Sequence, residues 1–345
     1  MYKDNVIAID IAKSVFQVCV FDKHNQIKSN QEIRRQKLMA WLAKQPASIV
    51  ALEGCGSSHY WAKVAEKLGH TPLQIPTRFV KKFVEGQKTD KNDAIAIGIA
   101  ARQPNLKPVA VKSDEQLALQ ACEKMRKHYQ DVAISTSNMM RSILYEFGIV
   151  IPQGESALKS KLPDILEDAE NGLPMMLRQP LHQQFQLWLS LKERINEATK
   201  YLRAQLRTHT ICNELQKLDG IGPVNALNLY LTLGTKGESF KNGREAAACI
   251  GLTPKQHSSG GKVVMLGISK HIAKKQLRAN LIQGALAKIK VVAKRAPKNT
   301  REVWMKQLIE RRGLRRAAVA LANKMVRVAW AMVHHQQPYK SPQAM

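Results

Sequence analysis

Four carboxylates stand where together they could hold a divalent metal. Asp10 and Glu53 each end a short apolar run of the kind that forms a buried strand. Asp90 and Asp93 lie three residues apart, so a helix that begins there turns both side chains to one face. Carboxylate oxygens are ligands for Mg²⁺, which can activate an attacking oxygen and stabilise a leaving oxygen at a phosphodiester. The pattern therefore predicts a magnesium site for phosphodiester chemistry.

Each of these acids has a plainer explanation when it is taken alone. Asp90 could cap the start of a helix, and Asp93 could simply interact favourably with the helix dipole. The set favours a metal site, because two acids follow buried strands, two share a helical face, and four converging carboxylates would repel one another without a cation.

A second candidate site is a short segment rich in serine and glycine. It consists of Ser258, Ser259, Gly260 and Gly261, with His257, Lys262 and Lys270 nearby. A serine hydroxyl beside glycines can reach a phosphate without steric hindrance, and neighbouring cations would stabilise a pentacoordinate phosphorane. Two roles stay open on this chemistry alone: a phosphate-binding loop or a serine nucleophile. The histidine could be a general base, a phosphate contact or a packing residue.

The composition points to a polyanionic partner. The 345 residues include 54 Lys and Arg against 27 Asp and Glu, a net charge of +27 that is concentrated in the last third of the chain. Such a field favours nucleic acid. No apolar run is long enough for a membrane helix, and five scattered cysteines without a CxxC pair indicate reduced thiols in a cytoplasmic, nucleoid-associated protein.

Residues 1–110 have the pattern of an α/β domain. The predicted elements are three strands of a meander at 6–9, 15–21 and 26–33, a helix at 36–44, a strand ending at Glu53, a helix at 60–68 and a strand at 72–75. This order matches the ribonuclease-H fold, in which acids from the first and fourth strands meet carboxylates on a late helix.

Residues 111–214 predict two long helices. Apolar residues step by four and three from Met125 to Phe147 and again from Leu181 to Leu202. A segment rich in Pro and Gly, residues 151–181, is expected to be the loop between them. Two alternatives stay open: an antiparallel coiled-coil hairpin within one chain, or a seam that pairs two copies.

Residues 215–336 are predicted to form a mostly helical domain that contacts nucleic acid, followed by a disordered tail at 337–345. Gly220 and Gly222 resemble a helix-hairpin-helix turn, whose backbone N–H groups approach a phosphate, although an ordinary helix break explains them equally well. The side chains expected to contact phosphates are Lys241, Arg244, Lys262, Lys270, Lys274, Lys275 and Arg278, each of which could also be plain surface charge.

Several ordered segments resemble a known family. They are Ala8–Lys13, Leu52–Gly56, Lys88–Ala94, Gly251–Lys262 and Gly267–Lys270. These segments are similar to the Asp-Glu-Asp-Asp domain and the C-terminal transposase domain of insertion-sequence family one-ten, the bridge-RNA-guided transposases, over about residues 5–335. One stretch departs from the family pattern, because His271–Gln276 replaces the usual Gly-Asn or Gly-Asp step.

The resemblance implies a specific mechanism. The four carboxylates would bind Mg²⁺ in a RuvC-type domain, and a serine would join covalently to DNA during strand exchange. The serine directly before glycine, Ser259, is the expected nucleophile, and Ser258 is the fallback. Dimers would assemble to tetramers on donor and target DNA, with carboxylates from one subunit and serine from another, and a structured bridge RNA would select both DNAs.

These observations predict a DNA transposase that excises and inserts its own element. Two other functions remain open. One is a Holliday-junction-type endonuclease that uses metal-activated water and forms no covalent intermediate. The other is a non-catalytic nucleic-acid-binding protein, whose binding would depend strongly on salt and need no metal.

Overall fold

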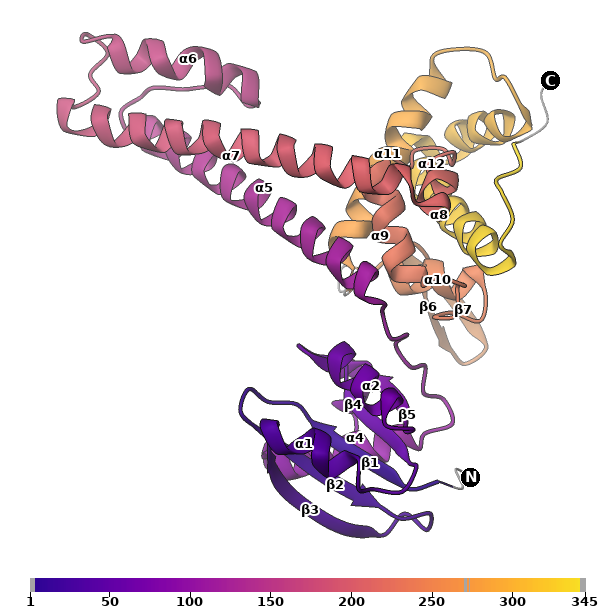
Figure 1. The fold of residues 1–345 in the computed structure, drawn as a ribbon. Helices are drawn as coiled ribbons and strands as arrows, with labels where there is room; N and C mark the ends of the chain where they lie inside the picture. The colour runs from indigo at the N-terminus through magenta and orange to yellow at the C-terminus, as the bar shows by residue number, and fades with distance from the viewer. Residues whose placement is uncertain (1–3, 270–271, 273, 342–345) are drawn as a thin grey trace. The chain divides into compact units, whose positions relative to one another are not determined.

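The computed structural model describes residues 4–269, 272 and 274–341. The chain divides into two compact units, Met1–Ser113 with Thr232–Ala246, and Asp114–Leu231 with Ala247–Met345. The first unit is a mixed α/β layer structure, and the second is mostly helical (Figure 1).

The first unit is built on a five-stranded sheet. Its elements are β1 (Val6–Asp10), β2 (Val15–Phe21), β3 (Ile27–Arg34), α1 (Arg35–Leu42), β4 (Ile49–Glu53), α2 (Ser58–Lys67), β5 (Thr71–Ile75), α3 (Thr77–Val80) and α4 (Asp90–Ala101). The strand order is β3-β2-β1-β4-β5. Strands β1, β2 and β3 form the predicted antiparallel meander, while β4 pairs in parallel with both β1 and β5.

Helices cover both faces of this sheet, which explains the continuous apolar runs in β1 and β4. On one face Ile7 and Ile9 pack with residues of α1 and α2, including Trp61. On the other face Val6 and Ala8 pack against α4. Successive strand residues point to opposite faces, so both halves of each run are buried.

Helix α4 carries a glycine, Gly98, where it packs against the sheet, and this position has no room for a side chain. A Cβ added to Gly98 would lie 2.6 Å from Cζ of Phe21 in β2. Both residues are buried. The close approach aligns the N-terminal end of α4 with the carboxyl end of β1.

The remaining described residues form helices and one small sheet. The elements are α5 (Asp114–Glu146), α6 (Glu155–Glu167), α7 (Met175–Arg207), α8 (Thr210–Leu215), α9 (Pro223–Leu233), α10 (Gly243–Ile250), β6 (Pro254–Ser259), β7 (Lys262–Ile268), α11 (Lys275–Ala293) and α12 (Thr300–His335). Among the described strands, β6 and β7 pair with each other alone and form an antiparallel ribbon.

The two long helices α5 and α7 lie side by side within the chain (Figure 1). On α7 the predicted face is buried, including Leu181 and Trp188. On α5 the predicted face is correct at the buried Thr136 but off by one position at Met139, which is 39% exposed whereas Met140 is fully buried. A shift of one residue turns a helix face by about 100°, and two adjacent methionines conceal that shift in the sequence.

The segment 151–181 is not the simple loop that its prolines and glycines predict. It contains α6, with Pro163 inside the helix, and α7 already begins at Met175. A proline removes one intrahelical hydrogen bond. Leu158 and Leu162 are fully buried against the long helices, and this burial outweighs the loss.

The described part of the predicted tail is anchored. The Arg301 guanidinium donates to the Tyr339 hydroxyl at 2.6 Å, and the Tyr339 N–H donates to a carboxylate oxygen of Glu214 at 3.1 Å. Residues 342–345 lie outside the described part of the chain. Among the described residues, no helix has both the length and the apolar character to span a bilayer.

Candidate active site

The carboxylates meet at one edge of the sheet. Strands β1 and β4 are parallel neighbours with Ile9 opposite Leu52, so their last residues, Asp10 and Glu53, end at the same edge. Carboxylate oxygens of Asp10, Asp90 and Asp93 all lie within 4.8 Å of one another. Glu53 is outside this group of three.

The start of α4 leaves its two acids free to face the sheet. The side-chain oxygen of Thr89 accepts a hydrogen bond from the Asn92 N–H at 3.3 Å, so Thr89 is the N-cap. This geometry removes the plainer explanation of Asp90 as the cap. The side chains of Asp90 and Asp93 instead project from the first turn toward Asp10.

The electrostatics of the cluster favour a cation. The pKa of Asp10 is raised to about 6, chiefly by burial and then by the nearby charges of Asp93, Asp90 and Glu53. The backbone N–H of Ile11 donates to this carboxyl group and partly opposes the shift. Carboxylates that repel one another in this way, with oxygen as the only donor atom, fit a hard divalent cation such as Mg²⁺.

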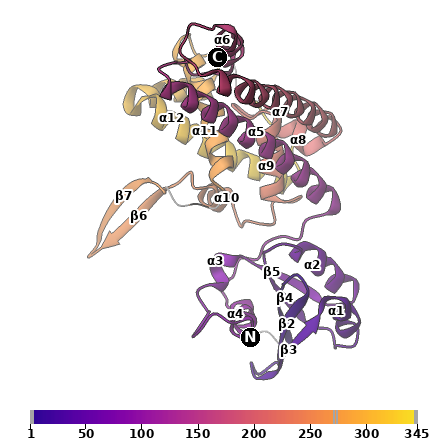
Figure 2. The same cartoon turned by 90° about the vertical axis from the view of Figure 1, so that its left-hand side faces the viewer.

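The serine segment forms the end of a hairpin, which the sequence did not predict. Ser259 pairs with Lys262, and a two-residue turn of Gly260 and Gly261 joins the strands. Both glycines have positive φ, 53° and 78°, as a type I′ turn requires. Figure 2 shows β6 and β7 as a ribbon that projects from the helices of its unit.

The two serines lie on opposite faces of this ribbon, because successive strand residues alternate. Ser258 shares a face with Gln256, whose side-chain amide donates to the Ser258 hydroxyl at 3.0 Å. Ser259 shares the other face with His257 and Lys262, since directly paired residues lie on the same side. The hydroxyl of Ser259 therefore has a cation beside it, and that of Ser258 has an amide.

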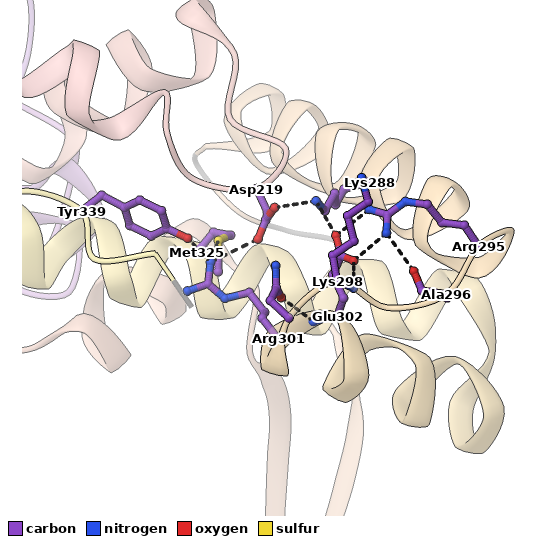
Figure 3. A network of polar contacts seen from close by, with 10 residues as sticks. Asp219, Lys288, Arg295, Ala296, Lys298, Arg301, Glu302, Met325 and Tyr339 are labelled. Atoms are coloured by element: carbon purple, nitrogen blue, oxygen red, sulfur yellow. Dashed lines mark hydrogen bonds and ion pairs between the residues drawn. The ribbon is translucent and has the colours of Figure 1, made fainter. Parts of the chain in front are cut away.

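The Gly220 turn is held by a polar network (Figure 3). Asp219 pairs with Lys288 at 3.0 Å and with Arg301 at 3.1 Å. A Cβ on Gly220 would lie 2.6 Å from the backbone of Gly284 in α11. The glycine is thus required for helix packing, whereas Gly222 is exposed with no atom within 4 Å of an added Cβ.

The predicted phosphate-binding cations differ in their surroundings. Those that are exposed are Lys241, Arg244, Lys262 and Lys275. Burial lowers the pKa of Lys274, which precedes α11. The Arg278 guanidinium donates to the carbonyls of Gly251 and Ser269, so it stabilises the chain around the ribbon. Lys270 lies outside the described residues.

Two cations near the carboxylates were missed from the sequence. Lys13 follows the β1 end by three residues, and Arg35 begins α1. The Arg35 guanidinium lies 5.4 Å from the ring centroid of Phe16 and 5.5 Å from that of Trp61. The signal for Lys13 is its position directly after the strand that ends at Asp10. The stacking of Arg35 joins residues far apart in the sequence, so no local pattern reveals it.

Comparisons with known proteins agree with this arrangement. Residues 7–149 match a transposase family model of the IS110 type with a DEDD domain, and residues 212–300 match the model of the IS116/IS110/IS902 transposase family. The chain belongs to the IS110 transposase family. The DEDD match spans the sheet, all four carboxylates and α5, and the second match spans the serine hairpin and α11.

Relatives of this transposase extend over almost the whole chain. A Pseudomonas aeruginosa protein named "Probable family 20 transposase" is 34% identical over 97% of this chain and 98% of its own length. The transposase for insertion sequence element IS1111A of Coxiella burnetii is 33% identical over 97% and 91%. A pilin gene-inverting protein of Moraxella bovis is 24% identical over 96% and 97%. The chain is therefore a DNA-processing enzyme of the transposase class.

Proposed function

We propose that this transposase cuts and rejoins DNA by a metal-dependent reaction in which Ser259 is the nucleophile. The observation that carries the proposal is the convergence of Asp10, Asp90 and Asp93 within 4.8 Å at the edge of a mixed sheet. The strand order β3-β2-β1-β4-β5 also supports a ribonuclease-H-like, RuvC-type domain. Mg²⁺ bound by these acids and Glu53 would supply charge neutralisation at the scissile phosphate.

The serine step exchanges one phosphodiester bond for another and so conserves the bond energy needed for rejoining. The Ser259 Oγ attacks phosphorus, the new O–P bond replaces one P–O bond of the DNA, and the serine proton ends on the released deoxyribose oxygen. Attack by a deoxyribose hydroxyl from another strand then reverses the exchange and releases the serine. Lys262 lies opposite Ser259 in the hairpin and would stabilise the negative phosphorane.

The DNA is selected by a partner in this proposal. Base pairing with a structured bridge RNA chooses donor and target, while the basic chain binds backbones with little sequence preference. The formal charge of +27 is consistent with a protein that holds several nucleic-acid segments. We infer that dimers assemble to tetramers, so that one subunit supplies the carboxylates and another supplies the serine.

The test compares two adjacent serines. The transposase is expressed with the flanking DNA of its element and RNA, and protein–DNA adducts are resolved under denaturing conditions. The Ser259→Ala variant should lose the adducts and keep RNA and DNA binding, while Ser258→Ala should retain most of them. Undiminished adducts in Ser259→Ala would reject its role. Hydrolysed ends that are never rejoined, in both variants, would instead indicate a junction-resolving nuclease.

RNA guidance has a separate test. Nucleic acid that copurifies with the protein is treated with nucleases, and the protected fragments are sequenced. A discrete structured RNA from the flank of the element is expected. Random host sequences alone would reject guidance by RNA.

A further inference from the structure

A depression adjoins the carboxylate cluster and is lined by cations instead of acids. Its volume is about 580 Å³, and its lining includes Ile11, Lys13, Arg35 and Cys55. Ile11 directly follows Asp10, and Cys55 lies two residues after the end of β4. Because β1 and β4 are parallel neighbours, the depression opens at the edge of the sheet where the carboxylates meet.

The Arg35 guanidinium is held in place by contacts that leave most of its donors free. It stacks on Phe16 and Trp61, and its Nη1 donates to the Ala12 carbonyl at 3.5 Å. A guanidinium has five N–H donors in one plane, so this single long hydrogen bond uses few of them. Lys13 is exposed in the same lining.

Neither cation has an acidic partner among the described residues, although four carboxylates lie nearby. The acids converge on one another and the cations line the adjoining depression. A nucleic-acid strand that brings one phosphate to the carboxylates carries its next phosphate past them. That neighbouring phosphate is repelled by the acids and requires positive charge of its own.

We propose that the depression formed around Arg35 and Lys13 binds the backbone phosphate next to the one that is processed. The inference rests on the proposed function in one respect: that a phosphodiester is processed at the carboxylates. Arg35 supplies planar, directed donors that can engage two phosphate oxygens together, and Lys13 supplies a mobile charge. The site positions the strand and does not read its sequence.

Cys55 provides a built-in reporter, because it is an exposed residue of the lining. The full chain is mixed with a short oligothymidylate and Ca²⁺, and the alkylation rate of Cys55 by iodoacetamide is measured by peptide mass spectrometry. The oligonucleotide should slow alkylation about tenfold at a concentration of about ten times its Kd. An oligonucleotide with uncharged methylphosphonate linkages should give no protection.

Variants locate the effect. Arg35→Gln should lose most of the protection, and Arg35→Lys should recover only part of it because the planar stacked donor is missing. Arg34→Gln is the matched control, since Arg34 is the exposed neighbour and does not line the depression. Equal protection in Arg35→Gln and Arg34→Gln would overturn the proposal.

A second variant, Lys13→Gln, tests the site independently in case Arg35→Gln fails to fold. The exposed Lys13 makes no hydrogen bond or ion pair with the described residues, so Lys13→Gln should fold normally and weaken protection. If the Lys13→Gln variant and the Arg35→Lys variant each kept full protection of Cys55 from alkylation, the proposed phosphate site would also be overturned. Protection requires no DNA cleavage, so Arg35-dependent protection without adducts would retain this phosphate site while rejecting the serine step. Protein–DNA adducts without Arg35-dependent protection would instead support the serine step and reject this phosphate site.

Discussion

Gly98 of α4 lies directly against the ring of Phe21 in β2, and this contact sets the height of α4 above the sheet. The first turn of the same helix carries two of the three converging carboxylates, Asp90 and Asp93. We therefore expect this packing contact to affect the geometry of the candidate metal site about two turns away along the same helix.

Gly98→Ala should therefore disturb the site even though alanine favours helices. The clash with Phe21 is expected to cost about 1–3 kcal/mol, which exceeds the gain in helix propensity of about 1 kcal/mol. Hydrogen exchange of α4 amides should accelerate, and metal-dependent stabilisation should weaken. The added variant Phe21→Leu should relieve much of the cost, and a fully additive double variant would contradict the packing argument.

The pKa of Asp10 predicts how the metal-free protein responds to pH. Because the pKa of Asp10 in the folded state is about 6, above its ordinary value of 3.8, the folded state holds a proton that the unfolded state has released between those pH values. Stability should then fall as pH rises from about 4 to about 6. Asp10→Asn should be more stable than the wild type at pH 7 by about 1 kcal/mol, a figure reduced for partial solvent exposure.

Adding Mg²⁺ should make the wild type more stable than Asp10→Asn, the opposite of the order expected without metal. The wild type should gain thermal stability with Mg²⁺ above pH 6, because the ligands must be deprotonated, and Asp10→Asn should gain little. Thermal melting across pH with and without Mg²⁺ checks both expectations. A wild type that is insensitive to Mg²⁺ at pH 8 would contradict a metal site at these acids.

Glu302 anchors the network beside the Gly220 turn (Figure 3). Its carboxylate accepts two hydrogen bonds from Arg295, at 2.7 and 2.8 Å, and pairs with Lys288 at 3.0 Å. Hydrogen bonds from Arg295, and then from the Lys298 N–H and Lys288, lower the pKa of Glu302 from its ordinary 4.5 to about 2. Its contribution to stability is thus present above pH 4.5 and is lost as pH falls toward 2.

Removing this charge should destabilise the helical unit. Glu302→Gln is expected to cost about 2 kcal/mol, because cations near a buried carboxylate lose their partner. Denaturant unfolding at pH 7 and pH 3 measures the difference, which should shrink at the lower pH. Glu310→Gln on the exposed part of α12 is the control, and an equal loss in both variants would contradict the network's role.

The hairpin turn offers a matched pair of substitutions. Gly260 has positive φ, which asparagine tolerates at the first position of a type I′ turn and alanine does not. Gly260→Asn should keep adduct formation, while Gly260→Ala should reduce it by displacing the neighbouring serine. Equal activity of the two variants would show that the turn geometry does not position Ser259.

Part of the first unit could be predicted because β1 and β4 are buried on both faces and each ends in an acidic residue. Asp10 and Glu53 are visible for that reason. The β6–β7 ribbon could not be predicted in the same way, because its residues are exposed and leave no alternation of burial. The choice between Met139 and Met140 on α5 depends on α7, which is distant in the sequence. The stacking of Arg35 on Trp61 likewise exists only after folding.

The most direct measurement is the identity of the residue that carries DNA. The transposase is incubated with its RNA and DNA substrates in Mg²⁺ or in a chelator, the DNA is digested, and peptides are mapped for a residual nucleotide. A nucleotide on Ser259, present with Mg²⁺ and absent from both the chelated sample and Asp10→Asn, is the expected result. Cleaved DNA with no modified peptide, or modification that persists without metal, would contradict the coupling of serine and carboxylates.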